Sequence, residues 1–401
     1  QNGGAGNITL VAGWDGTTYT PSAFATFGSG AYGNGGAVTE IGGADATGAV
    51  AVGSATGTTT IATSDLSLDA LNGYAQVGYH GAGSGNIGIL SNQVLSLNAN
   101  GTNAAQIGNG GTDTSGNVGG NISVHAGSIF ANMASGVGAI GNVGGDTTSS
   151  QSGNITIATE TGLTLETSGS SIVQIGNWSA DGTSGTANGT IQITAGTALN
   201  LDAYGDGSRV IIGNGGSKFV SGNEILTNSS ATGNITVHAG NVSLIAQDNS
   251  SFVQARIGNR GLTTAGGNID VEATTANATF AITAYGTNLA SIGNGIGLNT
   301  GSSSGNITVS SAGTLAITAI DSGQARIAGG FTANSNISVT ANGTVSLTVS
   351  GTPGTYQSGG PAPGQALIGN FGNGLSGLVG GNISITSTHG DITLLSDEDG
   401  G

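Results

Sequence analysis

The sequence predicts an all-β protein whose chain winds into a parallel β-helix, a solenoid with three short strands per coil and roughly ten coils. Two observations support this prediction: one unit repeats along the chain, and each copy alternates apolar and polar residues. A clear copy runs from Gly153 to Asn177. Its first phrase, Gly-Asn-Ile-Thr-Ile, and its last phrase, Ile-Gly-Asn, recur in most other copies. Because one such unit cannot bury its apolar face alone, successive units are expected to stack into a column.

Each copy holds three stretches in which apolar residues alternate with polar ones. Ile155 and Ile157 flank Thr156, and the same alternation follows at residues 163–166 and 173–175. A period of two is typical of strands, and the Gly, Asn and Ser between the stretches are typical of turns. Stacking would pair each strand in parallel with its copy in the next unit. At about 4.8 Å per coil, the column would be on the order of 50 Å long.

The composition limits which residues can fill the core and which classes of partner the protein can bind. Glycine contributes 79 residues, proline 4 and aromatic residues 4%, so the core must be narrow and filled by Ala, Val, Ile and Leu. A net charge of -16 argues against nucleic acid and against anionic membrane surfaces, and it permits calcium. No apolar run is long enough for membrane insertion. The absence of cysteine assigns stability to hydrogen bonds rather than to disulfides.

We interpret residues 1–401 as a single solenoid segment of a longer protein, because the chain begins at Gln1 and carries no leader pattern. Two stretches depart from the repeat. Residues 13–36 are rich in aromatic side chains, and residues 351–364 hold most of the prolines. Both are expected to be extended connections that leave the column.

The asparagine of the Ile-Gly-Asn phrase predicts a ladder at one corner of the column. Stacked side-chain amides can hydrogen-bond along the axis, and the preceding glycine allows a sharp bend. One copy reads Ile-Ala-Gly-Gly at residues 327–330, so the ladder should break there. We interpret these residues as structural: Asn109, Asn142, Asn177, Asn214, Asn259, Asn294 and Asn370.

Part of the repeat resembles a known family. The phrases at residues 74–81 and 105–111 are similar to repeats of filamentous-haemagglutinin-type exoproteins, large adhesins of Gram-negative bacteria secreted by the two-partner route. The resemblance extends from about Asn86 to Leu394. It implies a right-handed parallel β-helix, an outer-membrane secretion partner and a secreted location at the cell surface. It also implies a role in attachment or aggregation. The family's secretion domain, with its Asn-Pro-Asn-type motif, is absent, since the chain has no Asn-Pro pair.

Glu166 and Asp202 occupy equivalent outward positions of adjacent copies, and stacking would place them about 5 Å apart. The simplest interpretation is a pair of solvated side chains. The alternatives are a calcium site and a catalytic carboxylate pair. No third acidic residue is expected in this column, because the matching positions hold Asn98, Thr283 and Thr318.

The histidines and threonines are weaker candidates. His125 and His238 take the same place in copies that lie three coils apart, about 14 Å, so they cannot share a metal. The outward threonines of the first strand form a row that suggests ice binding. Gln192 and Asp270 interrupt this row, which makes it too irregular to match a lattice.

The best candidate for ligand contact is the aromatic group within residues 13–36, because exposed aromatic rings beside Asp and Asn often stack on sugars. The alternative is that these rings cover the end of the column or pack on one another. The residues are Trp14, Tyr19, Phe24, Phe27 and Tyr32.

Together these features predict the structural shaft or display region of a secreted adhesin that meets a cell-surface glycan or protein receptor. No residue is assigned to catalysis and no cofactor is required. Unpaired strand edges at both ends predict either continuation in the parent chain or end-to-end self-association into a filament. The competing classes are a polysaccharide enzyme that uses Glu166 and Asp202, and an ice-binding protein.

Overall fold

A computed structural model describes most of the chain, and strands form all of its regular secondary structure. No helix occurs in the part that it describes. The described residues are 1–12, 38–42, 50–146, 148–181, 184–220, 223–248, 253–295, 302–330, 335–351, 364–370 and 380–397.

The largest sheet has 18 strands and receives two strand segments from each repeat. The first segments are β1 (Ile8–Val11), β4 (Thr59–Thr63), β12 (Ile155–Thr159), β25 (Ile269–Ala273), β29 (Ile307–Ser311), β32 (Ile337–Ala341) and β35 (Ile383–Ser387). The second segments are β2 (Val38–Gly42), β5 (Asp65–Ala70), β13 (Gly162–Thr167), β26 (Thr279–Tyr285), β30 (Thr314–Ile320), β33 (Val345–Ser350) and β36 (Ile392–Asp397). In four repeats both segments form one continuous strand: β7 (Ile87–Ala99), β9 (Ile122–Met133), β17 (Ile191–Tyr204) and β22 (Ile235–Gln247).

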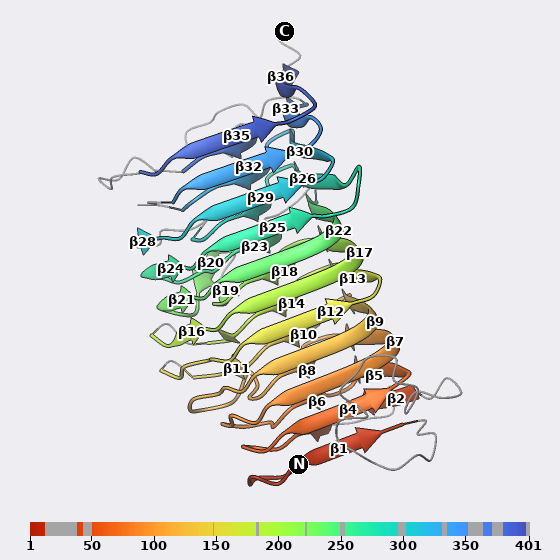
Figure 1. Cartoon of the computed structure of the whole chain (residues 1–401). Coiled ribbons are helices and arrows are strands. Elements are labelled where there is room, and N and C mark those ends of the chain that lie inside the picture. Colours follow the sequence, from red (N-terminus) through yellow and green to blue (C-terminus); the bar gives the residue numbers. More distant parts are fainter. Residues whose placement is uncertain are drawn as a thin grey trace.

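The third segment of each repeat joins a separate sheet of ten strands, which agrees with the number of units predicted from the sequence. These strands are β3 (Val50–Val52), β6 (Ala75–Val77), β8 (Ala104–Ile107), β10 (Gly136–Ile140), β14 (Ser171–Ile175), β18 (Arg209–Ile212), β23 (Gln254–Ile257), β27 (Leu289–Ile292), β31 (Gln324–Ile327) and β34 (Gln365–Ile368). Figure 1 shows the repeats stacked in sequence order, with the amino-terminal strand at one end and β36 at the other.

Every strand of these two sheets pairs in parallel with the equivalent strand of the neighbouring repeat. Ile155, for example, lies opposite Ile122 on one side and opposite Ile191 on the other. The predicted in-register stacking is therefore confirmed. Register is strongly specified because a slip of one residue would turn every buried side chain outward.

The core consists of aliphatic columns that run along the stack. Ile155, Leu165 and Ile175 represent its three sides, and each is fully buried. Burial of one such side chain contributes about 1.5–3 kcal/mol. The last repeat differs, because its strands have a described neighbour on one side only: Ile392 is 50% exposed and Leu394 74%.

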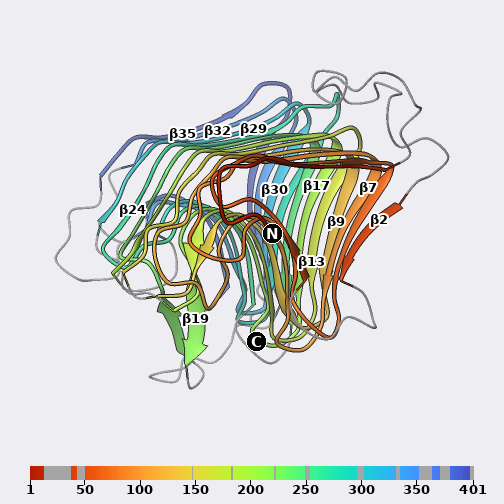
Figure 2. The same cartoon turned by 90° about the horizontal axis from the view of Figure 1, so that it is seen from below.

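Two features were not predicted by a repeat of three strands. A fourth column of short strands follows the third in the later repeats, and an antiparallel hairpin protrudes from the stack, as Figure 2 shows near β19. The fourth column pairs because its loops alternate polar residues with a buried alanine, as at Ala187 and Ala231. The fourth column contains β16 (Thr186–Asn188), β21 (Ser230–Thr232), β24 (Thr264–Gly266) and β28 (Ser302–Ser303). The hairpin consists of β19 (Ser217–Val220) and β20 (Asn223–Leu226). A separate two-stranded sheet pairs β11 (Val143–Gly144) with β15 (Trp178–Ser179).

Candidate functional site

The aromatic patch and most of the proline-rich segment lie outside the described residues. Nothing structural therefore tests the binding role predicted for Trp14, Tyr19, Phe24, Phe27 and Tyr32. The same holds for the two extended connections, because residues 13–37 and 352–363 are not described. These assignments stay predictions.

The buried asparagine ladder exists, but its hydrogen bonds differ from those expected. The Asn142 side-chain oxygen accepts from the backbone N–H of Asn109 at 2.9 Å. Its side-chain nitrogen donates to the carbonyls of Gly120 and Ser152, at 2.9 and 2.7 Å. The side-chain amides thus form hydrogen bonds along the axis as predicted, but their partners are backbone groups and not other side-chain amides. The pattern continues at Asn177, Asn214, Asn259 and Asn294.

A close approach between repeats requires the glycine before five of the ladder asparagines, namely Asn109, Asn142, Asn177, Asn214 and Asn259. A Cβ built on Gly176 would lie 2.0 Å from the carbonyl oxygen of Gly213, and its φ is 151°. No side chain can occupy that space without moving one backbone away from the other.

The predicted break in the ladder is also present. Gly329 stands where the asparagine belongs, since Ile327 pairs with Ile292 before it and with Ile368 after it. Asn370 still donates its side-chain nitrogen to Ser335 and Gly380. Its side-chain oxygen is buried and accepts no hydrogen bond.

A second asparagine ladder runs along the exposed corner before the first strand. The N–H of Asn154 donates to the side-chain oxygen of Asn121 at 2.9 Å, and that of Asn121 to Asn86. Here each side chain accepts from the following repeat, whereas the buried ladder accepts from the preceding one. The asparagine of the recurring phrase Gly-Asn-Ile-Thr-Ile is the sequence signal of this second ladder.

The acidic pair is brought together as predicted. Glu166 and Asp202 lie directly opposite each other on β13 and β17. The expected absence of a third acidic residue was wrong in detail, because Asp69 occupies the same column and accepts from Asn98 at 2.7 Å. It lies three repeats before Glu166, with Asn98 and Asn132 between them.

Burial, followed by the charge of Glu166, raises the pKa of Asp202 to about 6. Burial and then Asp202 also raise the pKa of Tyr204, two residues further along β17. One oxygen of Asp202 is buried and has no hydrogen-bond partner. No group of three His, Cys, Asp or Glu side chains in the described ranges has metal-binding geometry. Calcium takes about six to eight oxygen ligands, so this pair would leave most positions to water.

The two histidines of the first strand lie in one column, with Ala158 and Thr194 between them. They are thus separated as predicted. His238 has neighbours that the sequence analysis missed: its Nε2 lies 3.8 Å from carboxylate oxygens of both Asp270 and Glu272. All three side chains are partly exposed, as expected for surface charges.

All four arginines are buried, at most 4% exposed, and three of them lie on third strands. Loops cover that side. Arg209 donates to the carbonyl of Ser217 at 2.8 Å, and burial lowers the pKa of Arg326 to about 10. The remaining side-chain cation, Lys218, contacts Asp181 at 2.8 Å. The outer surface of the described region is consequently almost purely anionic.

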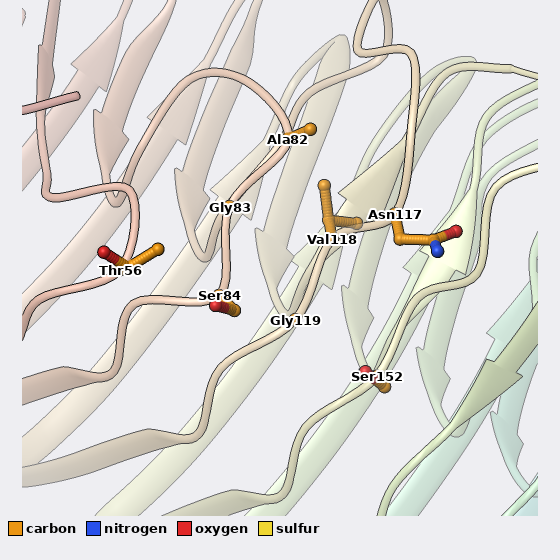
Figure 3. Close-up of a pocket in the computed structure, with 8 residues that line it drawn as sticks. All are labelled: Thr56, Ala82, Gly83, Ser84, Asn117, Val118, Gly119 and Ser152. Atoms are coloured by element: carbon orange, nitrogen blue, oxygen red, sulfur yellow. The ribbon is translucent and has the colours of Figure 1, made fainter. Parts of the chain in front are cut away.

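A cavity of about 340 Å³ opens at the corner between the third and first strands of the early repeats. Figure 3 shows the polar side chains of Thr56, Ser84, Asn117 and Ser152 along it, with Val118 between them. We call this site the corner groove. No sequence pattern predicts the corner groove, because it is built from turns of different length.

Comparisons of the chain with family models, with curated proteins and with solved structures found no match. In the described residues, no helix is long and apolar enough to cross a membrane.

Proposed function

We propose that the chain is a right-handed parallel β-solenoid that serves as the structural shaft or display region of a secreted adhesin. The observation that supports this most is the uninterrupted parallel pairing of the third strands from β3 to β34. A ladder of this kind gives length and stiffness, while its turns tolerate insertions. A shaft needs both properties, because it must hold recognition loops away from a surface.

The side chains fit a mechanical role better than a chemical one. The interior is aliphatic, and asparagines on two corners hydrogen-bond to the backbone of neighbouring repeats. Each satisfied hydrogen bond contributes about 1 kcal/mol, and many repeats add up along the axis. An anionic exterior also keeps such a column soluble and away from nucleic acid.

The resemblance to filamentous-haemagglutinin-type exoproteins supplies the cellular setting of the proposal. The parent protein would be exported through an outer-membrane partner to the surface of a Gram-negative bacterium. There it would bind a glycan or protein receptor, or promote aggregation. The strand edges of β1 and β35 each lack a second described neighbour, which allows further repeats or a second copy to extend the column.

The test is an attachment assay with the purified chain on beads, against cells and immobilised glycans. Specific attachment that soluble chain competes away would support the proposal. Attachment indistinguishable from that of beads coated with an inert anionic protein would overturn it.

A polysaccharide-active enzyme is the second candidate, and the raised pKa of Asp202 beside Glu166 favours it. Retaining glycosidases use two carboxyl groups about 5 Å apart, one of which has a raised pKa. Sugar release by the chain that Glu166→Gln abolishes would support this candidate. Equal release by the variant and the unchanged chain, or no release from any glycan, would remove it.

A further inference from the structure

The corner groove follows one position of the repeat through four successive repeats. The register places Thr56, Ser84, Gly119 and Ser152 at equivalent points, two residues before the first asparagine or its substitute. Parallel strands stack about 4.8 Å apart, so the groove runs along the axis for roughly 14 Å. Gly119 has no side chain, and the hydroxyl of Ser152 lies 3.0 Å from the position that a Cβ would take there.

The groove lies where the fourth strand column has not yet begun. From β16 onward the equivalent turns pair with one another, as Thr186 does with Ser230. In the earlier repeats only isolated bridges occur, such as Val118 with Gln151. The turns of residues 82–84 and 117–119 form no paired strands, although the N–H of Gly119 donates to the carbonyl of Gly83 at 2.8 Å. The groove opens beside this contact.

Four side-chain hydrogen-bond donors of the corner groove have no acceptor within the described protein. The hydroxyls of Thr56, Ser84 and Ser152 and the side-chain nitrogen of Asn117 make no hydrogen bond to any described residue, although the oxygen of Asn117 accepts from Ser150. Thr56, Ser84 and Asn117 are exposed, and Ser152 is half-buried. Four donors, spread over four levels of the stack, thus face solvent from one hollow.

The lining also has an apolar part and no ionisable group. Val118 is buried beneath the hollow and Ala82 borders it. Acidic side chains dominate the exposed charge of this protein, yet none of them lines the groove. A ligand here would meet hydroxyls, one amide and the exposed methyl group of Ala82, which suits a ligand that is polar, uncharged and partly apolar on one face.

We propose that the corner groove binds an uncharged linear oligosaccharide that lies along the axis of the stack. Sugar hydroxyls take the hydrogen bonds of Thr56, Ser84, Asn117 and Ser152, and the C–H face of a ring lies over the exposed Ala82. The regular spacing of polar groups matches a chain of repeated units better than a single small molecule. This inference deepens the adhesin proposal by naming a ligand class and a site.

The experiment measures binding of the complete chain to short linear oligosaccharides of glucose, mannose and galactose, beside sulfated and uronic-acid oligosaccharides, by calorimetry. Ala82→Trp fills the exposed rim of the groove, and the double variant Ser84→Ala with Ser152→Ala removes two hydroxyls. Thr308→Val, on an exposed strand face far along the chain, is the matched control for loss of a surface hydroxyl. Unfolding curves of each variant show that the fold is kept.

We expect a neutral oligosaccharide to bind, at least tenfold weaker binding by Ala82→Trp, weaker binding by the double variant, and no change in Thr308→Val. Binding only of charged glycans, no binding of any glycan, or equal binding by Ala82→Trp would overturn the groove assignment. The bead attachment assay separates the two proposals. Attachment that survives Ala82→Trp keeps the adhesin function and removes this site from it.

Discussion

The middle repeats, residues 153–294, and the last repeats, residues 305–397, are built from the same kinds of strand segment but differ in what surrounds them. In the middle, the buried asparagine ladder is continuous and the core is covered on both sides. In the last repeats the ladder is broken at Gly329 and core side chains of β36 are exposed. Yet β31 and β34 still pair without a slip. The core columns therefore set the register, and the ladder adds stability to a register already chosen.

The largest difference is expected for core truncation. Leu165→Ala removes a fully buried side chain of the middle, and should lower the free energy of unfolding by about 2–5 kcal/mol. Leu394→Ala, at the equivalent position of β36, should lower it by less than about 1 kcal/mol, because that side chain is 74% exposed. Urea titration followed by circular dichroism measures both. Equal losses would mean that the last repeat is covered in solution.

Loss of one asparagine of the buried ladder should have the next largest effect on the free energy of unfolding. Asn214→Ala leaves three buried backbone groups unpaired: the N–H of Asn177 and the carbonyls of Gly189 and Thr232. We expect a loss of about 3 kcal/mol or more in the free energy of unfolding. Asn370→Ala leaves only two backbone groups unpaired, the carbonyls of Ser335 and Gly380. Its loss in free energy of unfolding should therefore be about one third smaller than that of Asn214→Ala. A larger loss at Asn370 than at Asn214 would contradict the hydrogen-bond assignment.

The break can also be repaired. Gly329→Asn should restore an acceptor for the N–H of Asn294 and raise the free energy of unfolding by about 1 kcal/mol. Gly330→Asn is the matched control one residue later. A Cβ at Gly330 would lie 2.5 Å from the carbonyl oxygen of Gly295, so this variant should be destabilised. Hydrogen exchange of β31 and β34 shows whether protection rises in the first variant and falls in the second.

The smallest effect concerns pH and belongs to the middle repeats alone, because Thr318 and Thr348 replace the acids in this column later on. The folded pKa of Asp202 is raised from 3.8 to about 6, so the folded state binds the extra proton between these values. The contribution of Asp202 to stability is therefore most favourable below about pH 4 and is lost as the pH rises through about 6.

Asp202→Asn should remove this slope and stabilise the chain at pH 7 by about 1 kcal/mol, after allowance for solvent screening. Thermal unfolding at pH 4 and pH 7 measures it, and the two proteins should be nearly equal at pH 4. Calcium at pH 7 should raise the unfolding temperature of the unchanged chain and not of Asp202→Asn, if the pair binds this ion. A variant less stable than the unchanged chain at pH 7 would contradict the assigned direction of the pKa.

Individual residues show which structural features could be predicted from the sequence and which could not. The alternation at Ile155 and Ile157 was enough to predict the strand, its buried face and its partners in the next repeat. The break in the buried asparagine ladder at residues 327–330 was predictable from the sequence alone. The partners of Asn142 were not predictable, because they are backbone groups of turns whose course depends on loop length. The corner groove was missed for the same reason, and so was the burial of Arg256.

The sequence by itself determined the all-β class, the parallel stacking and the equivalence of positions between repeats. A side-chain period of two decides locally which residues face inward, and a repeated unit must place them over one another. Only the tertiary structure decided which backbone groups the asparagines satisfy, which loops cover the arginines and where a hollow opens. Those outcomes depend on distances between turns of different repeats, and no local pattern in the chain encodes such distances.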